Sequence, residues 1–248
     1  MQLLLQDGSA LAAPRPITDD AAGAEALAAL YAPGPGLTVR AMMNTTIDGA
    51  VTGSDGSSGT LRNADDSLVF AVLRSLADVV LVGAGTVRAE DYTQPTGHAA
   101  LDPRAHRPGG AGRPELAVLT STGDLPEELL GDSAGWPVLA LCPPEHRDRV
   151  IKRSGLAAER VLPAADAAEA VERLATRGHR LIQAEGGPGT LGRLAAARRL
   201  DELCFSTTHR TVGGDASRAI TGAAAEQDWR LASLLVGAEA TIGRYRRA

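Results

Sequence analysis

The stretch LADVVLVGAGTV (residues 76–87) decides the fold that is predicted for this chain of 248 residues. Its centre, residues 78–82, is a short apolar run of the kind expected of a strand that is buried on both faces of a sheet. A Gly-Ala-Gly turn follows directly, and a helix that begins after such a turn offers free N–H groups to an anion. Thr86 adds a hydroxyl at the same place. The stretch therefore predicts a strand that leads through a tight turn into a helix.

This turn by itself supports two interpretations. Glycines allow a ligand to approach the backbone, yet Arg88 stands where the dinucleotide-binding fingerprint has its third glycine. A plain strand–helix turn without a ligand fits as well. A second stretch, EGGPGT (residues 185–190), has the same arrangement after another apolar run, and Pro188 suits a first helical turn. Two such turns in one domain favour phosphate binding, with Glu185 at the carboxyl end of its strand, where ligands bind in open α/β sheets.

Outward from these turns, strands and helices are predicted to alternate. Strands are predicted over residues 37–43, 78–82, 116–119, 138–141, 161–162, 180–184 and 203–207, and helices over 144–153, 166–177 and 191–197, besides one that Asn63 caps and that ends near residue 76. This alternation predicts an α/β fold of three layers, α/β/α, with a mostly parallel central sheet. Residues 229–236 and 240–245, with Gly237 between them, predict a C-terminal antiparallel hairpin.

The chain is predicted to consist of an N-terminal extension and one domain. Residues 1–36 are rich in Ala, Pro and Gly, with one helix over 21–30 that the PGPG sequence at 33–36 ends. Residues 37–248 carry the regular pattern and form the domain. The long polar segment 99–112 is expected to be mobile or to form the mouth of a site.

Composition argues against several function classes. The formal net charge is −5 and no basic cluster stands out, which argues against a nucleic-acid partner. The two cysteines are isolated and the five histidines lack the spacing of metal ligands, so neither a disulfide scaffold nor a metal is expected. No run approaches the roughly 18 apolar residues of a membrane span, and the start of the chain lacks a signal-peptide pattern. A cytoplasmic protein without a membrane partner is expected.

The glycine turns and the segments around them resemble the reductase domain of riboflavin biosynthesis, the C-terminal half of the bifunctional deaminase–reductase. The matching stretches are TTIDG (45–49) for the family's S-x-D-G, residues 76–87 for its A-D-x-x-x-V-G-x-G-T-V, residues 184–188 for its E-G-G-P, Asp201-Glu202-Leu203 for its D-E-L and Val212-Gly213-Gly214 for a later G-G. LYAP (30–33) also resembles the lead-in of stand-alone actinobacterial members. The resemblance implies a dihydrofolate-reductase-like fold.

The resemblance also implies a reaction and partners. NADPH would give a hydride to C1′ of 2,5-diamino-6-ribosylamino-4(3H)-pyrimidinone 5′-phosphate, or of its deaminated form, and the opened sugar would become a ribityl chain. Members of the family are usually dimers, so a homodimer is expected. The zinc deaminase half is missing from this sequence, and another enzyme is expected to carry out that step.

Site residues follow from the same resemblance. Asp48 and Glu185 are the predicted catalytic residues: Asp48 would orient the substrate or help to deliver a proton, and Glu185 would accept hydrogen bonds from ribose hydroxyls or the base. Ser58, Arg74 and Glu185 are the predicted substrate-binding residues, with Arg74 at the 5′-phosphate. The predicted cofactor-binding residues are Asn44, Thr60, Gly83, Gly85, Thr86, Val87, Glu90, Thr120, Gly186, Gly187, Gly189, Thr190 and Leu191, of which Thr120 ends a strand where hydroxyls could receive a 2′-phosphate.

The sequence departs from the family pattern in two places. Residues 58–62 read SGTLR where many members have S-x-W-I-T, so an indole contact to the cofactor is lost. The stretch EDYTQPTG (90–97) lacks the family's loop arginine, for which Arg104 or Arg107 is the predicted substitute. These changes leave two alternatives open, a dihydrofolate or other pteridine reductase on the same scaffold, and a non-catalytic nucleotide-binding regulator.

Overall fold

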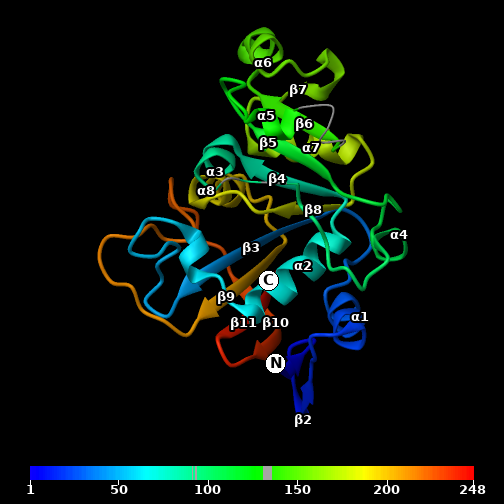
Figure 1. Cartoon of the computed structure of the whole chain (residues 1–248), viewed down its shortest axis with the longest axis vertical. Coiled ribbons are helices and arrows are strands. Elements are labelled where there is room, and N and C mark those ends of the chain that lie inside the picture. Colours follow the sequence, from blue (N-terminus) through cyan, green and yellow to red (C-terminus); the bar gives the residue numbers. More distant parts are fainter. Residues whose placement is uncertain (91, 93, 131–135) are drawn as a thin grey trace.

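The computed structural model describes residues 1–90, 92, 94–130 and 136–248. Within these residues eleven strands form one sheet, in the order β2-β1-β10-β11-β9-β3-β8-β4-β5-β6-β7 (Figure 1). The strands are β1 (Gln2–Gln6), β2 (Ser9–Pro16), β3 (Thr38–Thr46), β4 (Val79–Gly83), β5 (Glu115–Leu119), β6 (Val138–Cys142), β7 (Val161–Pro163), β8 (Leu181–Ala184), β9 (Glu202–Thr208), β10 (Trp229–Val236) and β11 (Ala240–Arg247).

The sheet is parallel in one part and antiparallel in the other. Every neighbouring pair from β9 to β7 is parallel. Beyond β9, the strands β11, β10, β1 and β2 continue the sheet with antiparallel pairs. The C-terminal hairpin closes where Gly237 N–H donates to the carbonyl of Ala240. The predicted α/β class, with a mostly parallel sheet and a C-terminal antiparallel hairpin, is confirmed.

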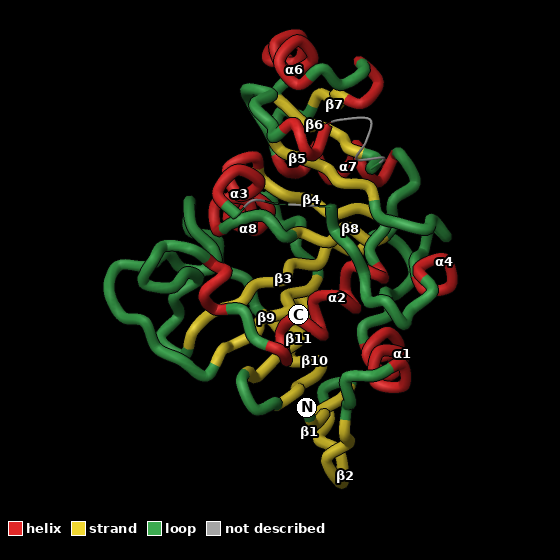
Figure 2. The backbone as a smooth tube through the Cα atoms, viewed as in Figure 1, coloured by secondary structure: helices red, strands yellow, loops and turns green. Residues whose placement is uncertain are grey.

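Helices cover both faces of the sheet (Figures 1 and 2). They are α1 (Ala21–Leu30), α2 (Ala64–Leu76), α3 (Ala84–Ala89), α4 (Pro103–His106), α5 (Glu127–Leu130), α6 (Arg147–Ser154), α7 (Ala167–Thr176) and α8 (Pro188–Ala196), with the 3₁₀ turns η1 (Ser58–Leu61), η3 (Pro144–His146) and η4 (Ala158–Arg160). Alternate residues of β4 define the layers, because successive strand side chains point to opposite faces. Leu81 packs in a cluster with residues of α7 and α8, whereas Val80 packs with residues of α3 and α5.

Asn63 is the N-cap of α2, as the sequence predicted. Asn63 Oδ1 accepts a hydrogen bond of 2.8 Å from the N–H of Asp66, so one of the free donors of the first turn of α2 is satisfied. Helix α8 instead begins at Pro188, three residues before the predicted start, because proline is tolerated in the first turn. None of the helices in the described ranges is long and apolar enough to cross a membrane.

The first sixteen residues form a hairpin that the sequence did not predict. Strand β1 pairs with β10, and Leu3 is fully buried opposite Leu235. Strand β2 is the outer edge of the sheet and its residues are mostly exposed, so it lacks the alternation of apolar and polar residues that identifies a half-buried strand. These residues continue the central sheet, and the domain boundary at residue 36 stays a prediction.

The segment 99–112, predicted to be mobile or to form the mouth of a site, packs against the amino end of β4. Gly109 N–H donates to Asp78 Oδ1 over 2.7 Å, and the buried side chain of Arg107 donates to the carbonyl of Ala77. Both contacts are at the amino end of β4, opposite the carboxyl ends where the glycine turns lie. The segment is therefore not the mouth of a site at those turns, and Arg107 cannot take the place of a loop arginine there because its guanidinium group is bonded to backbone carbonyls.

Candidate active site

The two glycine turns pack directly against each other, because β4 and β8 are neighbours in the sheet. The N–H of Gly187 donates to Thr86 Oγ1 over 2.8 Å. A Cβ on Gly83 would lie 2.8 Å from Thr190 Oγ1, and one on Gly186 would lie 3.0 Å from the backbone nitrogen of Gly83. Real Cβ contacts at such distances require a shift of the neighbouring atoms. Glycine is therefore needed at these positions for the two turns to meet.

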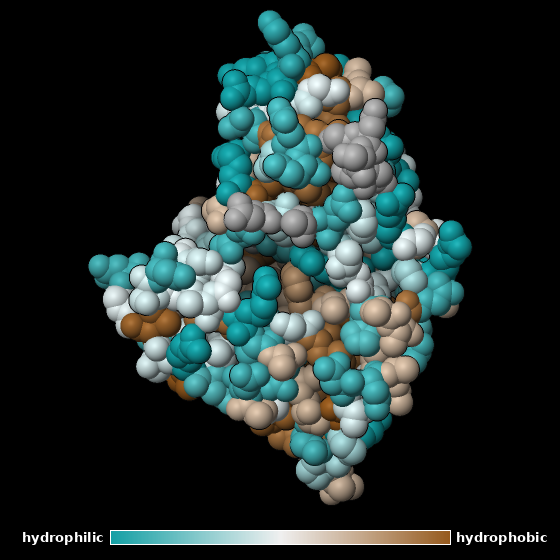
Figure 3. Space-filling view, viewed as in Figure 1, coloured by the Kyte–Doolittle hydropathy of each residue, from teal (hydrophilic) through white to brown (hydrophobic). Residues whose placement is uncertain are grey.

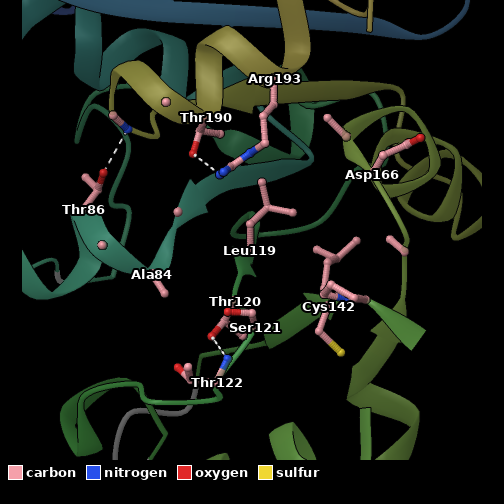
Figure 4. A pocket seen from close by; sticks show the side chains of 18 of the residues that line it. Ala84, Thr86, Leu119, Thr120, Ser121, Thr122, Cys142, Asp166, Thr190 and Arg193 are labelled. Carbon is pink, nitrogen blue, oxygen red and sulfur yellow. Dashed lines mark hydrogen bonds between the residues drawn. The ribbon is translucent and has the colours of Figure 1, made fainter. Parts of the chain in front are cut away.

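Gly85 and Gly189 have a different role. A Cβ on either of them would meet no atom within 4 Å, and both residues line a cleft of about 630 Å³ (Figure 4). A volume of this size is in the range of small-molecule binding sites. The absence of side chains at these two positions leaves the floor of the cleft open, so a ligand can approach the backbone at the start of α8.

The cleft is built to receive an anion. Helix α8, of nine residues, begins on it at Pro188 and presents the N–H of Gly189 together with the hydroxyl of Thr190. Two arginines, Arg88 and Arg193, also line it, and Arg193 donates to Thr190 Oγ1. Figure 4 shows Thr120 and Ser121 from the end of β5 facing the same space. Hydroxyls, helix N–H groups and guanidinium groups together suit phosphate oxygens.

The predicted cofactor-binding residues divide into three sets. Those that line the cleft are Gly83, Gly85, Thr86, Thr120, Gly187, Gly189 and Thr190. Gly186 belongs to the packed turns, and Val87 and Leu191 are fully buried in the core behind them. Asn44, Thr60 and Glu90 do not line this cleft. The structure thus brings about half of the predicted set together around one space.

Of the last three residues, Asn44 and Glu90 connect separate segments beside the cleft, whereas Thr60 does not. Asn44 Nδ2 donates to the carbonyl of Leu61 over 2.9 Å, and its Oδ1 accepts from the hydroxyl of Thr208. Thr60 donates within its own loop, to Asp55. Glu90 Oε2 accepts a hydrogen bond of 2.7 Å from the hydroxyl of Ser58, a predicted substrate-binding residue. This last contact ties η1 to the end of α3.

A second group of predicted residues forms an ion pair. Arg74 donates from Nη2 to Glu185 Oε2 over 2.7 Å and from Nε to Glu185 Oε1 over 2.9 Å. The hydroxyl of Tyr92 donates to Glu185 Oε2 as well, and it accepts from Arg74 Nη2 over 3.2 Å. The guanidinium group lies 4.2 Å from the ring centre of Phe70 and 5.5 Å from that of Tyr92. We call Arg74, Glu185, Tyr92 and Phe70 the Glu185 cluster.

Burial and neighbouring charges keep the phenol of Tyr92 neutral and the guanidinium group of Arg74 charged. Burial raises the pKa of Tyr92 well above its usual value, and the nearby Glu185 carboxylate raises it further. Burial by itself would lower the pKa of Arg74, but Glu185 outweighs it and raises the pKa above the ordinary value. The phenol therefore stays protonated and the guanidinium stays charged. The side chains of Arg74 and Glu185 are 17% and 2% exposed, so the pair is closed to bulk water on most sides.

Asp48 has the contacts of a residue that positions loops. Its carboxylate accepts from the N–H groups of Gly213, over 2.7 Å, and Val212, and from the hydroxyl of Thr46. These hydrogen bonds, above all those from Thr46 and Gly213, lower the pKa of Asp48. The ionised carboxylate thus joins the turn after β3 to the loop after β9. Asp48 lines a separate cleft of about 670 Å³, with Phe205.

Asp48, Thr86 and Glu185 lie at one edge of the sheet but face different spaces. They follow the carboxyl ends of β3, β4 and β8, which are adjacent. Thr86 faces the first cleft and Asp48 the second, whereas Glu185 turns towards α2. The space-filling view shows a hollow near the middle of the molecule, between the loop after β3 and α2 (Figure 3). Whether one ligand touches all three residues stays a prediction.

Sequence reasoning missed the two aromatic members of the Glu185 cluster. Phe70 precedes Arg74 by four residues, a spacing that places two helical side chains on one face, and this signal could have identified it. Tyr92 stands in a stretch that the sequence marked only as a departure from the family pattern. Its two chain neighbours, Asp91 and Thr93, are outside the described residues. No local pattern indicates that its hydroxyl reaches Glu185, which is 93 positions away.

Comparisons with known proteins identify the family and the fold of the chain. A family model described as the RibD C-terminal domain matches residues 37–242. Similar solved structures include a pyrimidine reductase-like protein from Corynebacterium diphtheriae, with a TM-score of 0.72, 22% identity, and coverage of 86% of this chain and 92% of that one. The riboflavin biosynthesis reductase of Saccharomyces cerevisiae gives a TM-score of 0.61 at 16% identity, over 89% and 94% of the two chains.

A third similar structure is the RibD protein of Acinetobacter baumannii, with a TM-score of 0.66 and 15% identity. The match covers 86% of this chain but only 58% of that protein, so the chain spans little more than half of its length. No curated protein matches the sequence. At these identities the solved structures show a shared fold, and the family model carries the assignment of the family.

Proposed function

The chain belongs to the RibD C-terminal domain family, a family of reductases, and from this membership we propose that it is an NADPH-dependent enzyme of riboflavin biosynthesis. The proposed substrate is the ribosylamino-pyrimidinone 5′-phosphate, in its diamino or its deaminated form. The proposed product carries a ribityl chain in place of the ribosyl group.

The observation that carries this proposal is the pair of packed glycine turns. Gly83, Gly186 and Gly187 bring the turns together, while Gly85 and Gly189 keep the adjoining cleft open. A turn that served only to connect a strand to a helix would not need a second turn locked against it through Thr86. The arrangement supports binding of an extended, phosphorylated ligand such as a dinucleotide.

The residues of the cleft fit the cofactor. The N–H of Gly189, at the start of α8, and the hydroxyl of Thr190 would hold the pyrophosphate. Thr120, Ser121 and Arg88 would receive the 2′-phosphate, which distinguishes NADPH from NADH. Bound NADPH would supply the hydride. The two arginines of the cleft are needed because a cofactor with three phosphates brings several negative charges to one place.

The reaction needs a fixed sugar. The bond between C1′ and the ring oxygen breaks, C1′ receives the hydride, and the oxygen receives a proton to become the new hydroxyl. Glu185 would orient the ribosyl group by accepting hydrogen bonds from its hydroxyls, and Ser58, held by Glu90, would also contact the substrate. Asp48 would act through the loops that it joins, because its lowered pKa suits an acceptor. We therefore propose a positioning role for Asp48.

Oxidation of NADPH with candidate substrates tests this proposal. The purified chain is mixed with NADPH and, in parallel, with the diamino-pyrimidine phosphate, its deaminated form and dihydrofolate, and the absorbance of NADPH is followed. We expect turnover with a ribosylamino-pyrimidine and none with dihydrofolate. Turnover with dihydrofolate alone would assign a pteridine reductase. Binding of NADPH without any turnover would support a non-catalytic regulator, and failure to bind NADPH would end the proposal.

A further inference from the structure

The loop that joins β9 to β10, residues 209–228, is fixed at two points (Figure 1). At the first point, two of its N–H groups donate to the carboxylate of Asp48. At the second point, the N–H of Thr221 donates to the carbonyl of Pro188 over 3.2 Å, in the first turn of α8. The carbonyl of Thr221 comes so close to Gly192 that a Cβ there would lie 1.6 Å from its oxygen. The part of the loop between these points is held in place by its ends.

The second cleft, of about 670 Å³, lies between this part of the loop and the sheet. On the loop side it is lined by Gly214, Ala216 and Ala219, whose side chains are small or absent and leave the space open. Phe205, on the sheet side, packs with residues of α7 and α8, whereas its neighbour Cys204 packs with residues of α2. The cleft therefore lies on the opposite face of the sheet from α2. None of the described residues that line it belongs to the first cleft or to the Glu185 cluster.

Two aromatic rings form the sheet side of the cleft. Phe205 on β9 is paired with Gly243 on β11. A Cβ on Gly243 would lie 2.7 Å from Cε2 of Tyr245 and 3.0 Å from its hydroxyl oxygen, so the ring of Tyr245 lies over the glycine. The absence of a side chain at Gly243 thus allows the two rings to lie beside each other. Both are partly exposed, and they offer their surfaces to a planar group.

The polar groups that remain available in this cleft are hydrogen-bond donors. Among the described residues, the guanidinium group of Arg218 and the hydroxyls of Tyr245 and Thr207 have no partner. The carboxylate among the described lining residues is that of Asp48, and it already accepts from the hydroxyl of Thr46 and from two N–H groups. A ligand that supplies acceptors fits such a set, and a guanidinium group favours an anionic one.

From these contacts we propose that the second cleft binds a planar aromatic molecule that carries an anionic group. Its ring lies on Phe205 and Tyr245, and its anionic group is held by Arg218. The volume of the cleft accommodates a ring system of two or more rings. This site is separate from the proposed reaction, and it contains neither the proposed cofactor-binding residues of the first cleft nor the Glu185 cluster.

Binding of three naphthalene derivatives by the full chain tests the proposal. The probes are 1-naphthoate, 1-naphthyl phosphate and the neutral 1-naphthamide, and their affinities are measured by calorimetric titration. We expect at least one of the two anions to bind about tenfold more tightly than the amide, because a hydrogen bond to a charged group is stronger than one to a neutral group. The two anions distinguish a carboxylate ligand from a phosphate ligand. Equal affinity for all three probes, or no binding of any, would overturn the proposal.

Two variants separate the charge from the rings. Arg218→Gln should weaken binding of the preferred anion about tenfold and leave binding of the amide unchanged. Arg104→Gln is the matched control, because it removes an exposed arginine from α4, outside the cleft, and should change neither affinity. Phe205→Leu keeps an apolar side chain but removes a ring, and should weaken binding of the anion and the amide alike, by about threefold to tenfold. An Arg218→Gln variant that binds the anion as tightly as the unmodified chain would contradict the proposal.

Competition experiments locate the bound probe. We expect neither NADPH nor ribose 5-phosphate to displace it, and displacement by either would place it in the first cleft or at the Glu185 cluster and overturn the proposal. Sedimentation at several protein concentrations examines another occupant. If the affinity for the probe falls as the chain associates, a second copy covers the cleft and the proposal is wrong. The titrations do not depend on turnover, so this proposal and the proposed function can fail separately.

Discussion

Two clusters of glutamate, arginine and tyrosine lie at opposite ends of the strands, one at the carboxyl ends and one at the amino ends. They differ in the groups to which their arginines donate hydrogen bonds. In the Glu185 cluster, Arg74 gives its donors to a carboxylate and a phenol at the carboxyl ends of the strands. At the amino ends, Glu202 pairs with Arg40 over 2.7 Å and with Arg244. We call Glu202, Arg40, Arg244 and Tyr31 the Glu202 cluster.

The arginines of the Glu202 cluster also bind backbone. Arg40 Nη2 donates to the carbonyl of Tyr31 over 2.6 Å, and Arg244 donates to the carbonyl of Leu30. These carbonyls end α1, where a helix has unpaired acceptors. Arg40 is fully buried, and although burial opposes ionisation, Arg40 and Arg244 lower the pKa of Glu202 to about 2. This cluster fastens α1 to the sheet.

The comparison shows that residue types alone do not define a site. The same kind of ion pair fastens a helix to the sheet in the Glu202 cluster, whereas in the Glu185 cluster we propose that it recognises a ligand. A difference in position along the strands decides between the two, because loops and helix starts gather at the carboxyl ends and leave room for ligands there. Variants in both clusters test this distinction.

Replacing the glutamate of each cluster should have the largest effect. Glu202→Gln leaves Arg40 and Arg244 buried without their counter-ion, and we expect the free energy of unfolding to fall by about 3–5 kcal/mol. Glu185→Gln should lower it by about 1 kcal/mol, because Arg74 is partly exposed, but should impair turnover. Denaturant titrations and NADPH oxidation measure both. Equal losses of stability in the two variants would show that the clusters do not differ as described.

Alanine substitutions in the two glycine turns should distinguish the glycines needed for packing from those needed for NADPH binding. Gly186→Ala places a Cβ 2.8 Å from Thr190, and we expect a loss of about 1–3 kcal/mol in stability. Gly85→Ala meets no neighbouring atom, so its stability should be unchanged, while its methyl group enters the cleft and weakens NADPH binding by about tenfold. Thermal unfolding and a fluorescence titration with NADPH test the pair. Unchanged binding in Gly85→Ala would place the cofactor elsewhere.

The stability of the fold should depend on pH in opposite directions through Asp66, whose pKa is raised, and Glu202, whose pKa is lowered. Asp66 lies in the first turn of α2, and burial raises its pKa to about 6, although Ser206 and Arg62 act in the opposite direction. Since protonation is easier in the folded state than in the unfolded one, this group stabilises the fold below its unfolded pKa and loses that contribution as the pH rises through 6. We expect the stability of Asp66→Asn, relative to the unmodified chain, to rise by about 1–2 kcal/mol between pH 5 and pH 8.

Glu202 has the opposite effect, because its pKa is lowered in the folded state. Its contribution to stability is present above the unfolded pKa of 4.5 and is lost as the pH falls towards 2. Acid unfolding followed by circular dichroism, with Asp66→Asn beside the unmodified chain, measures both trends. A variant with the same pH profile as the unmodified chain between pH 5 and pH 8 would show that Asp66 is not buried as an acid.

The smallest effect is expected at Asp48. Asp48→Asn keeps one acceptor for the N–H groups of Val212 and Gly213, so the two loops remain near one another. We expect kcat/KM to fall by less than about tenfold, with the same dependence on pH, since general acids contribute about a hundredfold or more. A larger loss with a displaced pH profile would instead make Asp48 the proton donor. Steady-state kinetics between pH 5 and pH 9 decide the matter.

Much of the fold was predictable because its signals are local. The apolar run before Gly83, the cap at Asn63 and the turn at Gly237 each depend on a few adjacent residues, and the structure places strands, helix and hairpin accordingly. The start of α8 was three residues late in the prediction, and the hairpin of residues 2–16 was missed, because β2 is an exposed edge without alternation. Edge strands depend on a partner strand for their pairing, and β1 finds its partner in β10.

The sequence predicted which residues belong to the candidate site but not which of them contact one another. Thr86 and Gly187 were both identified from their glycine turns, but only the pairing of β4 with β8 brings them within 2.8 Å. Arg74 and Glu185 were assigned separate roles towards a substrate, and the structure joins them to each other across 111 positions. Distance along the chain hides such a pair, since nothing in either segment indicates its partner.

For this protein, the sequence alone determined most strands and turns, the layers and the residues available for chemistry, because backbone preferences and apolar periodicity act over a few residues at a time. The tertiary structure decided how those residues combine. It paired Arg74 with Glu185, placed Arg40 and Glu202 under α1, and opened the cleft at Gly85 and Gly189. These outcomes depend on strand order and on burial, which only the folded chain sets.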